Sequence, residues 1–281
     1  MKIIICILNY HQVELVKKLL TDLISQKISN CYIYIGDVQP SYDEEKNINK
    51  YIENIGGKNV INYFTIDKNL GYACGNNLII KKAMMHIDNI DYVVICNPDI
   101  RVQNENLLSD LLKKMKCIND CAIIGPKVIT PSNRQQGPYL EPNIKLYILK
   151  HFLPFLWYPF WLIRERHISK IINVQKVWRI IGAFMIIDFN VFNRIQFFDE
   201  NTFLYWEEDI LSLKLKSINK HVYFDPSCEI NHVHGSNGVK TVSRYDIESM
   251  SYYFSSSGEN KIWIEIAKLS VKFYNMIRKH I

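Results

Sequence analysis

The sequence predicts an α/β fold built on a doubly wound, mostly parallel sheet, and three observations lead to this prediction. Short apolar runs alternate with helical patterns through residues 1–100, as expected when crossover helices connect parallel strands. Polar residues follow these runs directly, at the strand ends where such sheets bind their ligands. The length of 281 residues suits one large α/β domain or two small ones.

The elements of this first part can be placed by their periodicity. Apolar runs predict buried strands, and apolar residues repeating at three and four predict the helices between them. The strands are expected at 2–8, 31–37, 60–66 and 92–96. One helix is expected at 12–26, a second follows a polar turn at 38–47, and a third is expected at 77–87. The polar residues behind the strands are Asn9-Tyr10-His11, Asp37, Asp67-Lys68-Asn69 and Asn97-Pro98-Asp99.

The composition is that of an ordinary globular protein, with 48% hydrophobic and 22% charged residues. A net charge of +6 fits an anionic ligand or an anionic membrane surface but is too small to indicate nucleic acid, which we do not expect as a partner. Seven dispersed cysteines without a CxxC pair predict reduced thiols in a cytoplasmic protein. The apolar run at the N-terminus is too short for a signal peptide, so it predicts the first strand.

The segment 146–163 is densely apolar and aromatic. It is short for a transmembrane helix, contains Pro154 and Pro159, and carries Lys150 and His151. Two interpretations remain open: a buried irregular segment, or an aromatic surface that enters the membrane interface.

Further along, residues 177–192 predict a strand with a glycine at a close approach, and residues 221–237 predict a strand followed by a loop with His232 and His234. The tail from residue 261 predicts an amphipathic helix with Lys261, Glu265, Lys268 and Lys272 on one face. Such a helix packs on its own domain or docks on a membrane surface.

The stretch "FLYWEEDILSLKL", residues 203–215, places three acids behind aromatic residues. As a helix it directs Glu207 and Glu208 to either side of an inward leucine stripe, whereas Asp209 is expected to face solvent. Acids at a helix start complement the helix dipole, but this does not explain two that face inward. Alternating leucines leave a strand as the alternative.

Three other patterns admit both a functional and a structural interpretation. Asp99, behind a buried strand, suits a divalent cation bound to a nucleotide diphosphate, although Asn-Pro-Asp is also common in turns. His232 or His234 could add an imidazole ligand to the same cation. The glycine- and asparagine-rich loop 69–77 could approach an anion, or could be an ordinary strand-to-helix loop.

Taken in order, six segments between residue 3 and about residue 238 resemble the family 2 glycosyltransferases with a GT-A fold. The nearest branch is the rhamnosyltransferase-like one of bacterial surface polysaccharide and O-antigen synthesis. The segments are "CILNYH", "IGDVQPS", "NLGYACGNN", "ICNPD", "WRIIGAFMIIDFNVFNRIQFFDENTFLYWEED" and "NHVHGSN".

The resemblance implies a role for each matching residue. Donor-binding residues would be Asn9, Tyr10, Asp37, Asn69, Gly71, Asn77, Asn97 and Asp99, and the donor a UDP- or dTDP-type nucleotide sugar. Asp99 and His232 would hold Mn²⁺ or Mg²⁺, and Glu208 would be the catalytic base, with Glu207 as the second candidate. The acceptor side would comprise Trp178, Gly182, Ala183 and Trp206. The chain departs from the family at His11, after Asp37, and at Asn97, which replaces the first metal-motif acid.

These expectations combine into one hypothesis. Residues 1–100 would bind the nucleotide sugar, residues 101–240 would form the acceptor and catalytic half with an aromatic insertion at 140–175, and residues 241–281 would be a helical extension. The protein would be an inverting, metal-dependent glycosyltransferase acting on a lipid-linked oligosaccharide, peripheral on the inner face of the cell membrane. The alternatives are an inactive donor-binding or scaffold homologue and a glycoside hydrolase with a carboxylate pair.

Overall fold

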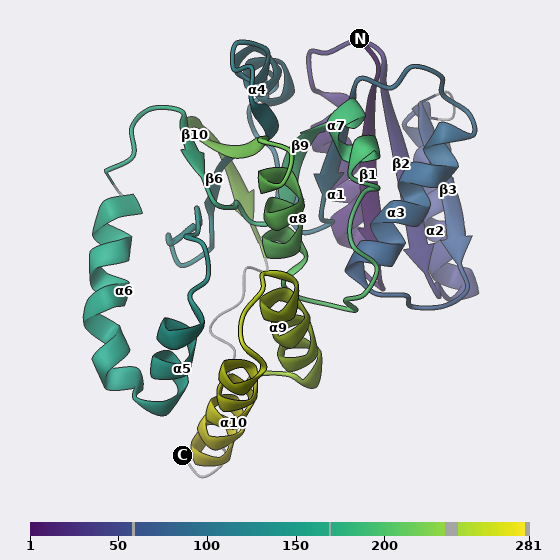
Figure 1. Cartoon of the computed structure of the whole chain (residues 1–281). Coiled ribbons are helices and arrows are strands. Elements are labelled where there is room, and N and C mark those ends of the chain that lie inside the picture. The colour runs from purple at the N-terminus through teal and green to yellow at the C-terminus, as the bar shows by residue number, and fades with distance from the viewer. Residues whose placement is uncertain (58–59, 169, 234–240, 279–281) are drawn as a thin grey trace.

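The computed structural model describes residues 1–57, 60–168, 170–233 and 241–278. Within these residues ten strands form a single, mostly parallel sheet, which confirms the predicted fold class. The strand order is β3-β2-β1-β4-β9-β6-β10-β5, with β7 on β6 and β8 on β10 (Figure 1).

The first part of the chain folds as alternating strands and helices. The parallel strands are β1 (Ile3–Asn9), β2 (Cys31–Val38), β3 (Ile61–Ile66) and β4 (Tyr92–Cys96). The helices between them are α1 (Val13–Ile24), α2 (Tyr42–Asn54) and α3 (Tyr72–Met84). Helix α2 begins inside the turn predicted at 38–47, because Ser41 and Glu44 form a reciprocal capping box at its start.

The sheet is buried on both faces, which explains why its strands are continuously apolar. Alternate residues of β1 enter two different cores: Ile3, Ile5 and Ile7 face α1 and α2, while Ile4 and Cys6 face α3. Side chains alternate across a strand, so each apolar run supplies both cores at once.

The second part extends the same sheet. Its strands are β5 (Ile100–Arg101), β6 (Cys121–Ile129), β7 (Gln135–Gln136), β8 (Gln175–Val177), β9 (Phe184–Asp188) and β10 (His221–His232). Its sheet-covering helices are α4 (Leu107–Lys116), α7 (Phe189–Arg194) and α8 (Glu207–Lys216). Strand β9 lies antiparallel between β4 and β6, so it joins the two parts of the chain within one sheet.

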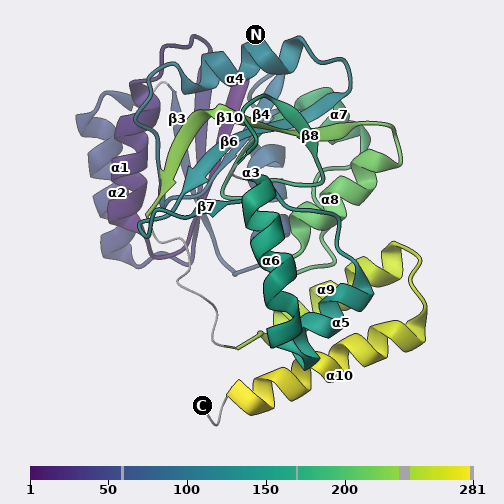
Figure 2. The same cartoon turned by 90° about the vertical axis from the view of Figure 1, so that its left-hand side faces the viewer.

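Four helices gather beside one end of the sheet: α5 (Ile144–Phe152), α6 (Pro154–Ile168), α9 (Arg244–Ser256) and α10 (Lys261–Arg278) (Figures 1 and 2). A third core cluster joins α5, α9 and α10 to Ile210 of α8. The excursion that carries α5 and α6 is closed at its base, where Tyr139 and Arg179 pair through a backbone hydrogen bond of 2.9 Å.

The aromatic segment 146–163 is neither irregular nor fully buried. It forms most of α5 and α6, with Pro154 at the start of α6, where proline is tolerated, and Pro159 inside that helix. Phe155 is 68% exposed and Ile163 is 65% exposed. In the described part of the chain, no helix combines the length and the apolarity that crossing a bilayer requires.

Candidate active site

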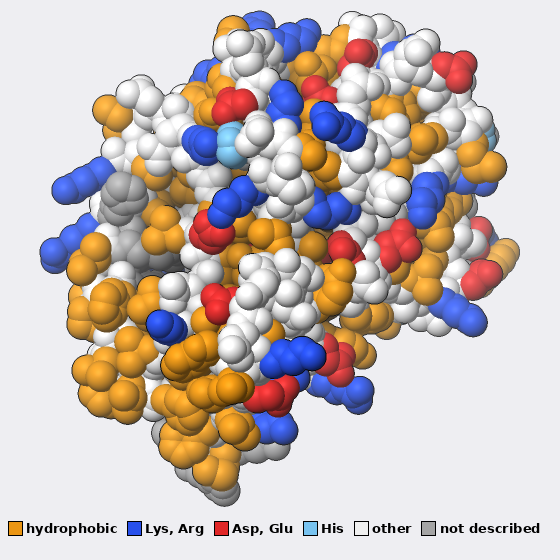
Figure 3. Space-filling model, in the orientation of Figure 1, with side chains coloured by type: hydrophobic (Ala, Val, Ile, Leu, Met, Phe, Trp, Pro, Cys, Tyr) orange, Lys and Arg blue, Asp and Glu red, His pale blue; other side chains and the backbone are white. Residues whose placement is uncertain are grey.

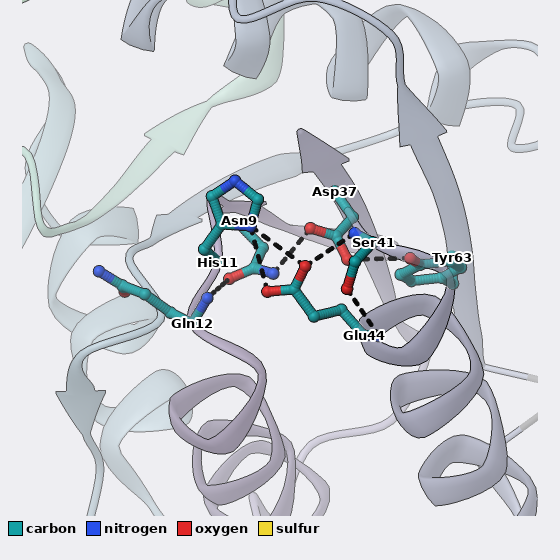
Figure 4. Close-up of polar contacts among 7 residues, drawn as sticks. All are labelled: Asn9, His11, Gln12, Asp37, Ser41, Glu44 and Tyr63. Atoms are coloured by element: carbon teal, nitrogen blue, oxygen red, sulfur yellow. Dashed lines mark hydrogen bonds and ion pairs between the residues drawn. The ribbon is translucent and has the colours of Figure 1, made fainter. Parts of the chain in front are cut away.

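The carboxyl ends of β1 and β2 bring Asn9 and Asp37 together, as the parallel pairing of these strands requires. Asn9 Nδ2 donates to Asp37 Oδ1 at 2.7 Å, and the Tyr63 hydroxyl donates to Asp37 Oδ2 at 2.9 Å (Figure 4). Burial raises the pKa of Asp37, and these two hydrogen bonds partly oppose that rise. Both carboxylate oxygens are therefore committed within the protein.

His11 lies beside this pair, in the left-handed region with a φ of 55°. Its Nδ1 is 3.1 Å from Glu44 Oε1, and its ring packs against Tyr10 with centroids 4.4 Å apart. Glu44 also accepts from the Ser41 backbone N–H at 2.7 Å, so one carboxylate both caps α2 and fixes His11 (Figure 4). Glu44 is a site residue that was not predicted, although the Ser-x-x-Glu spacing of a capping box marks it.

The loop before α3 is fixed by contacts with residues 198–203. Gly71 has a φ of +84°, and a Cβ there would collide with the carbonyl of Phe203, so glycine is required by this packing. Asn69 accepts from the Gly71 N–H at 3.0 Å. Asn77 donates to the Phe198 carbonyl at 2.9 Å and accepts from the Phe198 N–H at 3.1 Å. These contacts give Asn77 a structural role and do not support its predicted contact with the donor.

A chain of contacts links the end of β4 to the start of α8. The Asn97 N–H donates to the Ala183 carbonyl at 2.8 Å, and the adjacent Gly182 N–H donates to Glu208 Oε1 at 2.7 Å. The Tyr72 hydroxyl donates to the Gly182 carbonyl at 2.6 Å. A Cβ on Gly182 would collide with Glu208 Oε1, so glycine is needed here for the approach of that carboxylate.

The predicted metal ligands also meet. His232 Nε2, at the end of β10, lies 2.9 Å from Asp99 Oδ2, and His232 Nδ1 lies 2.6 Å from Gln136 Oε1. If a cation were bound, Nδ1 would donate its hydrogen to Gln136 Oε1, which would leave the lone pair of Nε2 for the cation. His234 lies outside the described residues.

This donor set fits a divalent cation held jointly by protein and diphosphate. Two ligands at right angles, each about 2.1 Å from an octahedral cation, stand roughly 3 Å apart, close to the Asp99–His232 separation. No cluster of three or more His, Cys, Asp or Glu side chains suited to a metal occurs among the described residues. The other ligands of such a cation would have to come from the substrate or water.

The two glutamates at the start of α8 have different surroundings. Glu207 is buried, and its Oε1 has no hydrogen-bond partner among the described residues. Burial, reinforced by the neighbouring Glu208 charge, raises the pKa of Glu207 to about 8. Glu208 is less buried, with Oε1 held by Gly182 and no described partner for Oε2. Glu208 thus offers a carboxylate oxygen without a described partner, while burial and the Glu208 charge favour the protonated form of Glu207.

The prediction that Asp209 faces solvent is wrong. Asp209 is only 3% exposed; it accepts from Trp178 Nε1 at 2.8 Å, and its Oδ2 lies 2.8 Å from Arg179 Nε. The prediction assumed that α8 buries a single stripe of its surface. The helix is instead covered on two sides, by the sheet at Leu211 and by the α9 cluster at Ile210. Burial raises the pKa of Asp209 to about 6 against the opposing charge of Arg179.

The turn that enters α8 has an unusual backbone. Tyr205 and Trp206 have φ values of 73° and 70°, and left-handed backbone costs about 1–2 kcal/mol per non-glycine residue. The Trp206 indole packs against Tyr253 and Phe254 of α9, with ring centroids 5.2 and 5.6 Å apart. These contacts differ from the predicted role of Trp206 at the acceptor.

A cavity of about 800 Å³ lies elsewhere in the described residues. It is enclosed by α6, β8, the second half of α8 and the start of β10, with Trp178 and Ser212 in its wall. Neither the Asp99–His232 pair nor Glu208 lines it. A shallower hollow of about 560 Å³ lies at His11 and Glu44, next to the Asn9–Asp37 pair.

No protein-family model matches the chain. Among curated proteins, the low-salt glycan biosynthesis hexosyltransferase Agl10 of Haloferax volcanii is 28% identical over 151 residues, covering 53% of this chain and 44% of that protein. The match therefore spans less than half the length of this relative.

Solved structures resemble the whole chain at low identity. The mannosyltransferase PcManGT of Pyrobaculum calidifontis, in complex with GDP-Man and Mn²⁺, has a TM-score of 0.59 at 10% identity and covers 99% of this chain and 70% of its own. GalNAc-T7 with UDP, GalNAc and Mn²⁺ has a TM-score of 0.65 at 13% identity, and the match covers 99% of this chain and 54% of that one. S. aureus TarS 1-349 in complex with UDP has a TM-score of 0.59 at 13% identity, and the match covers 98% of this chain and 71% of that one. The chain thus has the fold of the GT-A glycosyltransferases.

Proposed function

We propose that this chain is an inverting glycosyltransferase, which moves a sugar from a nucleotide-diphosphate donor to a hydroxyl group of a glycan acceptor. The observation that carries the proposal is the placement of Glu208, held by the Gly182 N–H beside the Asn97–Asp99 turn. The resemblance to a hexosyltransferase and the fold shared with nucleotide-sugar enzymes support it. Assignment to the rhamnosyltransferase-like branch remains a prediction.

The donor would lie along the carboxyl ends of β1, β2 and β4. Asn9 and Asp37 are locked together, so they form a rigid floor for the nucleoside, and the half-exposed Tyr10 ring beside them is available for stacking on a base. The diphosphate would reach Asp99 and His232, which would hold Mn²⁺ or Mg²⁺ with it. Such a cation stabilises the negative charge that the departing diphosphate gains.

Glu208 would act as the general base. Its free Oε2 accepts the proton of the acceptor hydroxyl, whose oxygen forms a bond to the anomeric carbon. The bond from that carbon to the diphosphate oxygen breaks on the opposite face, and the nucleoside diphosphate leaves with the bonding electrons. Attack from the opposite face inverts the anomeric configuration. Burial favours the protonated form of Glu207, which would add no second negative charge beside Glu208 in this step.

The acceptor would be lipid-linked, with the protein peripheral on the cytoplasmic membrane surface. Exposed apolar side chains of α6 and α10 gather on one side of the molecule, beside lysine and arginine side chains (Figure 3). They are Phe155, Leu156, Tyr158, Phe160 and Ile163 on α6, and Ile262, Leu269, Phe273, Met276 and Ile277 on α10. We call this set the α6–α10 surface. An apolar surface with adjacent cations suits an anionic bilayer.

The test of function is Glu208→Gln, assayed with a panel of UDP-, dTDP- and GDP-sugars, Mn²⁺ and synthetic lipid-diphosphate-linked sugars. Removing a general base lowers kcat by about 10²–10⁴-fold, and donor binding should persist because the amide keeps the bond to Gly182. The matched control is Glu105→Gln, an exposed acid paired with Lys27 away from the site.

Three outcomes separate the candidate functions. Nucleotide release that needs both donor and acceptor supports a transferase. Donor binding without turnover in the wild-type protein would leave a binding or scaffold subunit. Cleavage of glycosides without any nucleotide would leave a hydrolase. Near-normal turnover of Glu208→Gln would contradict the assignment of the base.

A further inference from the structure

The two residues that precede the helix of the proposed base both have left-handed backbone. Tyr205 and Trp206 are followed at once by α8, whose second residue is Glu208. The Ile210 N–H donates to the Trp206 carbonyl at 2.9 Å, so the first turn of α8 is built directly on Trp206. Any rotation of the Trp206 backbone would therefore turn the helix start that carries Glu208.

Helix α9 holds this turn through two side-chain hydrogen bonds. Trp206 Nε1 donates to Asp246 Oδ1 at 2.6 Å, and Ser249 Oγ donates to the Leu204 carbonyl at 3.0 Å. The indole is enclosed on three sides by aromatic rings of α5 and α9, from Tyr147, Tyr253 and Phe254. Asp246 is itself largely buried, and this burial raises its pKa.

The other side of the turn is held by the loop before α3. The Tyr72 N–H donates to the Phe203 carbonyl at 2.9 Å, and the Gly71 backbone packs against the same carbonyl. The turn is thus fastened between α9 and the donor-side loop. A left-handed pair of non-glycine residues persists only where its surroundings over-determine it, and such positions concentrate at functional sites.

We propose that Asp246 is a positioning residue for the reaction: through Trp206 it fixes the turn that sets the Glu208 carboxylate against Gly182. The inference rests on the proposed function, in which Glu208 is the base. It makes α9 part of the catalytic apparatus, whereas the sequence hypothesis placed residues 241–281 in an extension. Asp246 touches neither substrate nor reacting atoms in this scheme and acts only through Trp206.

The test compares Trp206→Phe, Asp246→Ala and Asp246→Asn. Trp206→Phe keeps a ring in the cluster but removes the indole N–H, and Asp246→Ala removes the acceptor. Both should lower kcat about 10- to 100-fold with the donor KM within about 2-fold, because small displacements of a reacting group cost rates of this order. Asp246→Asn keeps an oxygen that can accept from Trp206 and should restore most of kcat.

A stability control separates positioning from general loosening of the helices. Ile264→Ala removes a buried side chain of α10 from the same cluster but leaves the Trp206–Asp246 hydrogen bond in place, so it should lower Tm while kcat stays within about 2-fold. The double variant Trp206→Phe with Asp246→Ala should be no slower than the slower single variant, since the two single variants remove the same hydrogen bond.

The outcomes are distinguishable from a failure of the proposed function. If wild-type protein turns over and Asp246→Ala keeps the wild-type kcat, the positioning role is overturned while the transferase stands. If Ile264→Ala lowers kcat as much as Asp246→Ala does for the same loss of Tm, the positioning role is overturned too. If the wild-type protein shows no acceptor-dependent turnover, the proposed function falls, and this inference falls with it.

Discussion

At the residue scale, the three consecutive acids 207–209 perform different tasks because their surroundings differ. Asp209 is paired with Arg179 and accepts a hydrogen bond from Trp178, Glu207 is enclosed without a described partner for Oε1, and Glu208 is anchored by one backbone N–H. The sequence predicted that Glu207 and Glu208 would face inward and Asp209 outward, whereas the structure buries Glu207 and Asp209 and leaves Glu208 partly exposed. The ion pair of Asp209 could not be foreseen. Its partners lie about thirty positions away, on a segment whose pairing with β10 is a property of the whole sheet.

Glu207 should make the stability of the protein depend on pH. Its pKa is about 8 in the folded chain against an ordinary 4.5, so between these values the folded state holds a proton that the unfolded state has lost. Stability is then fully present below pH about 4.5, declines by up to about 1.4 kcal/mol per unit as pH rises, and levels off above pH about 8.

The check is Tm measured from pH 5 to 8.5 for the wild type and Glu207→Gln. The amide cannot titrate, so the Tm of the wild type should fall relative to that of the variant as pH rises. Asp209 titrates in both proteins and cancels from the difference. Parallel Tm profiles would show that Glu207 is ionised in the folded state at neutral pH.

At the element scale, α6 is the helix whose role is least explained by packing within the chain. It is apolar through residues 154–163; Phe160 and Ile163 line the cavity of about 800 Å³, and Phe155 and Tyr158 are exposed. The sequence indicated the unusual composition but not the helix, because two prolines in one apolar run favour irregular structure. The structure accommodates one proline at the helix start, where its missing N–H costs nothing.

The α6–α10 surface should bind anionic vesicles. The protein should sediment with phosphatidylglycerol vesicles at low salt and less with neutral phosphatidylcholine vesicles. Phe155→Ser together with Leu156→Ser should weaken the binding about tenfold or more, since both side chains are exposed outside the cavity and each side chain buried in the bilayer contributes about 1.5–3 kcal/mol. Met85→Ser, an exposed apolar residue at the end of α3, is the matched control and should bind like the wild type. Equal loss in both variants would contradict this docking surface.

At the scale of the whole molecule, the sequence predicted the class of sheet and the strands of its first part, because local periodicity decides those. It could not predict that β9 lies antiparallel between β4 and β6, since a continuous apolar run is compatible with either direction. The Asp99–His232 pair joins residues 133 positions apart. Local pattern left His232 and His234 as alternatives, and the family resemblance selected His232, because spacing in the chain does not determine which loops meet.

Metal binding should depend on nucleotide, because the described chain offers only two ligands from distant strands. Mn²⁺ alone should raise Tm little, whereas Mn²⁺ with UDP or GDP should raise it by several degrees as diphosphate oxygens complete the site. Asp99→Ala and His232→Ala should abolish this joint increase, and EDTA should reverse it in the wild type. Full stabilisation by Mn²⁺ without nucleotide would instead indicate a site made by the protein alone.

The closed base of the α5–α6 excursion has a consequence for how this protein can diversify. The chain leaves the sheet region at Tyr139 and returns at Arg179, where the two backbones pair, and between these residues the described chain adds only β8 to the sheet, beside β10. Insertions, deletions or exchanges within residues 140–174 therefore leave the donor-side strands undisturbed. Grafting a different excursion in place of residues 140–174 is a direct way to exchange the α6 part of the proposed docking surface while keeping the strands of the sheet.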